Sequence, residues 1–309
     1  MIKEFYDGMM LREEQFLVVS FTKLTSTNGN QYANIELQDT SGTIEGKKWS
    51  LDSDDYYVFE PGSIVSINGE VLAYKGVLQV KIYSARNIDK KYVDLSKFLI
   101  QSEYSLVNLK ERYNSLLNEI NDEEIKNLVV EVFNKYDEEL FSFPAAKRNH
   151  HNYLRGLITH SISMAEVALF LGKKYKNIDI SILVAGALLH DVGKIIELSG
   201  PAVTTYTTEG QLLGHISIGF SLIKEECERL NINNEKAVHL QHILLSHHGK
   251  MEYGSPVLPS TKEAILLSMI DDMDAKLELA DNVLENVEEG EFSGRVFAFN
   301  DRMLYKPQK

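Results

Sequence analysis

An apolar run that ends on a histidine and an aspartate constrains this chain more than any other feature. Residues 180–189 contain a single serine and no proline, and they are rich in alanine and leucine. This composition predicts a buried helix, and His190 and Asp191 follow it directly. A buried carboxylate without a partner is costly, and a metal cation is a suitable partner. The alternative interpretation is a core histidine followed by an aspartate that caps the next turn.

Further histidines and one aspartate, most of them on separate segments, extend this pair into an ordered group. Imidazole and carboxylate ligands together suit divalent manganese, iron, zinc or nickel better than magnesium or calcium. Two such ions bridged by one carboxylate need about this many ligands. The sequence therefore predicts a metal centre built from His160, His190, Asp191, His215, His247, His248 and Asp271.

Several neighbouring residues require a choice. Asp271 shares a helical face with apolar residues, whereas Asp272 points about 100° away, so we expect Asp271 to be the ligand. We expect His239 and His242 to be structural. Lys194 follows the His-Asp pair and could hold a phosphate as a point charge, although it could equally be a solvated lysine. Asp191 and Lys194 are thus the predicted catalytic residues.

The N-terminal region has a different pattern. Five short apolar or alternating runs are separated by turn signals such as 39–42 and Pro61-Gly62, and they predict strands. Five short strands over this length indicate a small closed barrel. Helical spacing begins near residue 93 and continues almost to the end. The expected domains are residues 1–92, a helical connector over 93–149, and a helical domain over 150–309.

The ordered ligands and their flanks resemble a known family. The order His, His-Asp, His, His-His, Asp resembles the HD-domain metallophosphohydrolases. Adding the flanks, the chain resembles the YhaM-type 3′→5′ exoribonucleases of Gram-positive bacteria over nearly its whole length. Residues 32–49, centred on Leu37-Gln-Asp-Thr-Ser-Gly42, resemble an OB-fold. The flanking motifs are Phe143-Pro-Ala-Ala146, His150-His151, Gly210-Gln-Leu-Leu-Gly-His215-Ile, Leu245-Ser-His-His-Gly249 and Glu252-Tyr-Gly-Ser-Pro256.

The resemblance implies a multidomain protein, with a small all-β OB-fold barrel followed by an all-α HD domain. It implies a metal-dependent 3′→5′ exoribonuclease that releases nucleoside monophosphates from single-stranded RNA, with single-stranded DNA as a further substrate to test. Manganese is the expected metal, with iron, nickel and zinc as alternatives. Three-metal relatives can carry a glutamate one turn before the first histidine. Gly156 stands there in this chain, which indicates one or two ions.

Four residues are predicted to bind substrate. Trp49 and Lys48 lie on the predicted barrel, where aromatic and basic side chains hold single strands. His151 and Tyr253 are placed near the active site, Tyr253 by the resemblance. Lys47 and Lys48 face opposite sides of a regular strand, so at most one of them faces a ligand. Packing inside the barrel is the alternative role for Trp49.

The bulk composition limits these interpretations. The net charge is −13, so the chain lacks the basic character usual for nucleic-acid binders. Bound metal ions and base stacking would have to supply much of the affinity. There is one cysteine, the N-terminus has no apolar signal region, and no apolar run reaches the ~18 residues of a membrane span. We therefore expect a cytoplasmic protein that is not bound to a membrane.

Two other functions stay open at this stage. The same metal site would serve a nucleotide phosphohydrolase or a cyclic-dinucleotide phosphodiesterase, with the barrel as a regulatory module. A non-catalytic RNA-binding protein is the second alternative, although the complete ligand group argues against it. Cleavage polarity and the preference for RNA come from the resemblance alone. Homo-oligomerisation is compatible with the sequence, which does not decide it.

Overall fold

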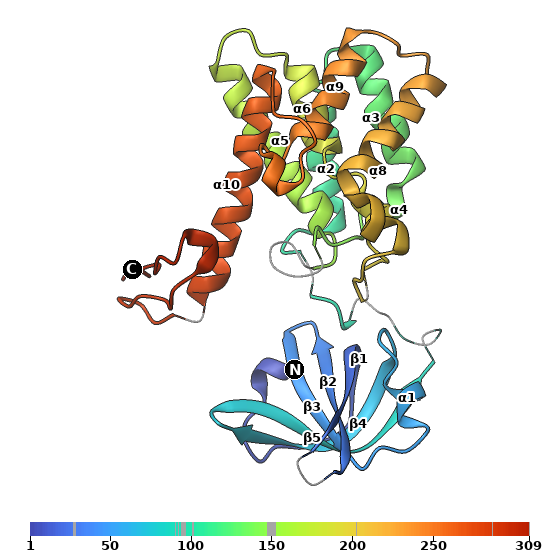
Figure 1. The fold of residues 1–309 in the computed structure, drawn as a ribbon, viewed down its shortest axis with the longest axis vertical. Coiled ribbons are helices and arrows are strands. Elements are labelled where there is room, and N and C mark those ends of the chain that lie inside the picture. Colours follow the sequence, from blue (N-terminus) through green and yellow to red (C-terminus); the bar gives the residue numbers. More distant parts are fainter. Residues whose placement is uncertain are drawn as a thin grey trace. The chain divides into compact units, whose positions relative to one another are not determined.

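The computed structural model describes residues 1–26, 29–89, 91, 93, 97–100, 102–146, 153–201, 203–285 and 287–308. The chain divides into two compact units, one built of strands and one of helices (Figure 1). The first unit is Met1–Ser102 with Gly200–Thr204, and the second is Glu103–Ser199 with Thr205–Lys309. The predicted fold class is confirmed. The boundaries predicted at 92 and 149 fall on residues outside the described ranges and stay predictions.

The first unit is a closed five-stranded barrel. The strand order is β1-β2-β3-β5-β4, with β3 and β5 parallel and the other pairs antiparallel. β1 pairs first with β4 and then with β2, because irregularities between Leu11 and Glu14 and between Val18 and Ser20 bend it. The elements are η1 (Ile2–Glu4), β1 (Met10–Thr25), β2 (Gln31–Asp39), β3 (Gly42–Trp49), α1 (Asp55–Val58), β4 (Ile64–Tyr74) and β5 (Val77–Ile88).

The second unit is a helical bundle around one central helix. Residues 181–189 of α6 (Ile180–Leu189) are all buried, as an evenly apolar helix requires. Asp179 caps α6 by accepting the N–H of Ile182 at 3.1 Å. The other elements are α2 (Leu106–Leu117), α3 (Glu123–Lys135), α4 (Asp137–Leu140), α5 (Gly156–Lys174), α7 (Lys194–Glu197), α8 (Thr208–Arg229), α9 (Glu235–Ser246), η4 (Met251–Tyr253), α10 (Lys262–Glu285) and η5 (Phe297–Phe299).

Helix boundaries place several of the predicted ligands. His190 directly follows α6, and His247 directly follows α9. Gly214 interrupts α8 with φ 71° and ψ 152°, so the second part of this helix begins at His215. Gly193 brings that helix close to the His-Asp pair, because a Cβ there would lie 2.0 Å from the carbonyl oxygen of His215.

No helix within the described residues is both long and apolar enough to span a membrane.

Candidate metal centre and nucleic-acid interface

The structure brings all seven predicted metal ligands together around the carboxylate of Asp191. Asp191 Oδ2 lies 3.3 Å from Nε2 of His190 and 3.8 Å from Nε2 of His160. Asp191 Oδ1 lies 3.5 Å from Nε2 of His215 and 3.7 Å from Nε2 of His247. The two oxygens therefore face different histidines. His248 stacks edge-on against His247, with ring centroids 4.4 Å apart.

Asp271 completes the group from α10. Its Oδ1 lies 3.4 Å from Nε2 of His160. Asp272, the next residue, is half exposed and pairs with Lys276 instead. The structure thus separates the two aspartates as the helical geometry predicts.

All five histidine rings are oriented by an oxygen at Nδ1. The oxygens accept, so each Nδ1 carries a proton and each Nε2 is the atom that can bind a metal. Asp274 and Glu197 supply side-chain oxygens, and backbone carbonyls supply the other three. The partners are Asp274 Oδ2 for His160 (2.7 Å), Ala187 O for His190 (2.9 Å), Glu197 Oε1 for His215 (3.1 Å), Leu244 O for His247 (2.8 Å) and Tyr253 O for His248 (2.7 Å).

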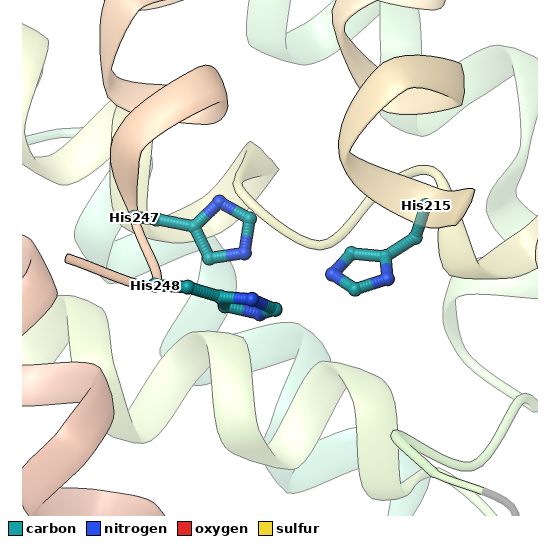
Figure 2. A group of neighbouring side chains, drawn as sticks. All are labelled: His215, His247 and His248. Atoms are coloured by element: carbon teal, nitrogen blue, oxygen red, sulfur yellow. The ribbon is translucent and has the colours of Figure 1, made fainter. Parts of the chain in front are cut away.

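The ligand atoms fall into two groups. One consists of His160, His190 and Asp191, and the other of three histidines, with ligand atoms within 4.8 Å of one another in each group. The second group comprises His215, His247 and His248, whose rings face a common space from two helix ends (Figure 2).

Three buried atoms at the centre have no hydrogen-bond partner among the described residues. They are Asp191 Oδ1, His215 Nε2 and His247 Nε2. Leaving such atoms unpaired costs about 1–3 kcal/mol each, and a cation among them would remove that cost. These three atoms are all acceptors or metal ligands, so the residues present fit a divalent metal ion.

The two sides of the cluster differ in charge. Burial would lower the pKa of His160, but its hydrogen bonds to Asp271 and Asp274 raise it to about 10. Burial and the neighbouring His190 hold the pKa of His247 well below its ordinary value. Without metal, His160 is therefore cationic and His247 neutral at neutral pH.

Lys194 is part of the cluster. Its Nζ lies 2.6 Å from Asp191 Oδ2, and its side chain is 12% exposed. Burial would lower the pKa of Lys194, but the charge of Asp191 raises it. The structure thus shows a largely buried, paired lysine, whereas the alternative interpretation was a solvated one.

The sequence interpretation missed two residues, Asp274 and Glu197. Asp274 follows Asp271 by three positions, so both lie on one face of α10, and this spacing could have identified it. Glu197 gives no such signal, because it lies in a one-turn helix and meets His215 only through the fold. Burial would raise the pKa of Glu197, but the hydrogen bond and charge of His215 lower it, so the residue is ionised.

The remaining histidine predictions have different outcomes. His239 Nε2 lies 2.8 Å from Thr261 Oγ1, and Ser260 N–H donates to His242 Nε2 at 2.9 Å. Both contacts tie α9 to the residues that immediately precede α10, as expected for structural residues. Tyr253 is 56% exposed and meets the cluster through its backbone carbonyl. His151 lies outside the described residues.

The barrel carries a groove beside Trp49. Trp49 is 45% exposed and stacks on Tyr32, with ring centroids 4.7 Å apart. Its ring is therefore on the surface and does not fill the barrel core. The groove is lined by Lys47, Trp49, Leu72, Tyr74, Gln79 and Lys81.

Lys47 and Lys48 do lie on opposite faces of β3. Lys48 Nζ is 3.6 Å from Asp55 Oδ2, and both side chains are largely buried. Lys47 lines the groove, with its Nζ 5.6 Å from the centre of the Tyr74 ring. The structure therefore places Lys47 beside Trp49 and leaves the predicted Lys48 in an ion pair away from the groove.

Comparison with known proteins agrees with this architecture. A family model described as "OB-fold nucleic acid binding domain" matches residues 17–88, and one described as "HD domain" matches residues 157–276. Fold and site together define a protein with an OB-fold nucleic-acid-binding domain and an HD domain that carries a metal-ligand cluster.

Two curated relatives match almost end to end. The 3'-5' exoribonuclease YhaM of Geobacillus sp. (strain WCH70) is 40% identical over 292 residues, covering 94% of this chain and 90% of that protein. The 3'-5' exoribonuclease YhaM of Bacillus subtilis (strain 168) is 38% identical over 307 residues, covering 97% and 98%. The chain belongs to the YhaM family of 3'-5' exoribonucleases, which confirms the predicted resemblance.

Among solved structures, the second OB-fold domain of replication protein A from Methanococcus maripaludis matches 29% of this chain and 94% of its own. The sequence identity is 22% and the TM-score is 0.25.

Proposed function

We propose that this protein is a metal-dependent 3′→5′ exoribonuclease that hydrolyses single-stranded RNA and releases nucleoside monophosphates. The observation that carries the proposal is the convergence of five imidazoles and the Asp271 carboxylate around Asp191, where three buried atoms lack a hydrogen-bond partner among the described residues. The names of the two full-length relatives support the polarity and the RNA substrate. Single-stranded DNA stays a further substrate to test.

The two groups of ligands support a pair of ions. Asp191 Oδ2 and Oδ1 face different histidines, so this carboxylate would be shared by the two ions. When bound, the ions supply an activated water and positive charge at the scissile phosphate. Imidazole and carboxylate donors favour manganese, with iron, nickel and zinc as alternatives. One ion would be held by His160, His190, Asp191 and Asp271, and the other by His215, His247 and His248, with Asp191 shared.

Lys194 would hold the substrate phosphate in this arrangement. Its side chain is largely buried beside Asp191, where few counter-ions from solvent can screen the ammonium group. A phosphate oxygen entering the cluster would therefore meet a fixed positive charge. Asp191 keeps Lys194 protonated and in place, so the two predicted catalytic residues act together.

The groove on the barrel would hold the RNA strand upstream of the nucleotide that is removed. Trp49, supported by Tyr32, offers a stacking surface, and Lys47 and Lys81 offer charges for the phosphates. Base stacking is worth about 1–3 kcal/mol per base and tolerates any sequence. We propose Lys47 for the role that the sequence suggested for Lys48. Tyr253 and His151 stay proposed substrate contacts.

We further propose a cytoplasmic location. The only cysteine, Cys227, is free and buried, which supports a reducing compartment.

The test uses a 5′-labelled single-stranded RNA with Mn²⁺, with EDTA, and with a His190→Ala/Asp191→Ala protein. We expect a ladder that shortens from the 3′ end, that requires metal, and that the double variant does not produce. RNA that stays intact with every metal tried would contradict the proposal. Hydrolysis of mononucleotides or cyclic dinucleotides under those conditions would then support the alternative phosphohydrolase.

A further inference from the structure

Glu197 makes two contacts with His215 through one oxygen. Its Oε1 accepts the backbone N–H of His215 at 2.9 Å and the ring Nδ1–H at 3.1 Å. Glu197 is the last residue of α7 and is buried. The Glu197 carboxylate therefore contacts His215 from α7, whereas His215 itself lies on α8.

The break at Gly214 explains why His215 needs this partner. His215 begins the second part of α8, and the first N–H groups of a helix have no acceptor within it. Glu197 supplies an acceptor and a negative charge at this point. Because the same oxygen holds the ring, rotating the imidazole would break one of two bonds at a buried carboxylate.

Glu197 is itself held by the segment before α8. Thr207 N–H donates to the Glu197 carbonyl at 2.9 Å, and Thr207 Oγ1–H donates to the carbonyl of Ile196 at 2.8 Å. Gly210 packs directly on Glu197, since a Cβ at position 210 would lie 2.3 Å from the Glu197 carbonyl oxygen. These contacts hold the backbone of Glu197 in place, and with it the position of the carboxylate.

We propose that Glu197 is a positioning residue that selects the Nδ1–H form of His215 and sets the affinity of the ion at His215, His247 and His248. This inference rests on the proposed two-ion function. His247 and His248 take backbone carbonyls as partners, which no substitution removes. Asp274 has the corresponding role for His160 in the other group. Loss of Glu197 therefore weakens the binding of one ion and leaves the binding of the other unchanged.

The experiment is a titration of the full-length, metal-free protein with Mn²⁺, in which electron paramagnetic resonance measures free Mn²⁺. We expect two binding events for the wild type. Glu197→Leu weakens one of them by about 10–100-fold, as is usual when the partner of a ligating histidine is removed. Glu197→Gln keeps an oxygen that can accept both hydrogen bonds, so it loses less affinity than Glu197→Leu.

Glu226→Leu is the matched control. Glu226 is a buried carboxylate on α8, the helix that carries His215, and it pairs with Arg229. This variant is expected to lower thermal stability and to leave both Mn²⁺ affinities unchanged. A general loss of packing in α8 would instead weaken Mn²⁺ binding in both leucine variants, which would overturn the inference.

A second readout does not depend on metal. Nitrogen-15 NMR of metal-free protein should show the Nδ1–H form of His215 in the wild type and in Glu197→Gln. The Nε2–H form in the wild type would overturn the inference, even if Glu197→Leu fails to fold. Unchanged affinities in a folded Glu197→Leu protein would overturn the role of Glu197 alone. A wild type that binds no Mn²⁺ would overturn the proposed function as well.

Discussion

Lys194 Nζ lies 2.6 Å from Asp191 Oδ2, the carboxylate oxygen that also faces the Nε2 of His190. The lysine therefore neutralises the central carboxylate while leaving the opposite oxygen, Oδ1, without a hydrogen-bond partner among the described residues. A protonated lysine cannot bind a metal ion. Lys194 therefore contacts a proposed metal ligand without being a metal ligand itself, and its substitution tests the role in holding phosphate separately from metal binding.

Lys194→Met should lower kcat on RNA by about 10²–10³-fold, the usual cost of removing one charged group that stabilises a transition state. Mn²⁺ affinity should not fall, because the variant removes a positive charge beside the ions. Steady-state kinetics with saturating Mn²⁺ and a Mn²⁺ titration test both points. Lys236→Met is the control, since this exposed lysine pairs with Asp122. Weaker Mn²⁺ binding by Lys194→Met would contradict the assigned role.

Asp271 and Asp272 provide a matched pair on one helix. Asp271→Ala should weaken Mn²⁺ binding and reduce RNA hydrolysis more than about 10²-fold, because it removes a ligand from one ion. Asp272→Ala should change both by less than about threefold, since it removes only a surface ion pair with Lys276. Equal effects of the two substitutions would show that the helix, and not the ligand, is responsible.

Metal binding should release protons at neutral pH. The pKa of His160 in the metal-free protein is about 10, so its ring is charged below that pH, and only the neutral ring binds metal. Lowering the pH therefore increases proton competition, and Mn²⁺ affinity for that site should fall about tenfold per pH unit below pH 10. Calorimetry in two buffers with different ionisation enthalpies measures the protons released. An affinity that does not change between pH 7 and 9 would contradict the charged state of His160.

The groove on the barrel predicts different effects for adjacent residues. Trp49→Ala should weaken binding of a single-stranded RNA by about 1–3 kcal/mol, the value of one stacked base. Lys47→Ala should weaken it and reduce its salt dependence, whereas Lys48→Ala should affect barrel stability through Asp55. Fluorescence anisotropy at several salt concentrations, with EDTA to prevent hydrolysis, measures these effects. Stronger loss with Lys48→Ala than with Lys47→Ala would place the strand elsewhere.

Much of this molecule follows from local patterns. Turn residues such as Pro61-Gly62 separate the strands, and the apolar run over 180–189 identifies the central helix. The order of histidines and aspartates identified seven residues that the fold brings together. The sequence did not show how far strands extend, because β1 continues through two irregularities to reach Met10–Thr25.

Contacts between distant segments could not be predicted from the sequence. Glu197 meets His215 only because Gly214 interrupts α8 and Gly193 allows the close approach. Alternation along β3 separated Lys47 from Lys48 but did not tell which faces the groove. The outer surface of the barrel depends on how five strands close, and this is a property of the whole sheet.

The contact between Gly193 and the carbonyl of His215 has a consequence for how the centre tolerates change. The backbone of Gly193 lies directly against the backbone of His215. This contact defines the spacing between the His-Asp pair and the helix that carries His215, and it does not depend on the arrangement of side chains. Substitutions in the surrounding core can alter stability while this dimension stays constant. The position of His215 relative to the His-Asp pair can therefore be kept while residues of the surrounding core vary.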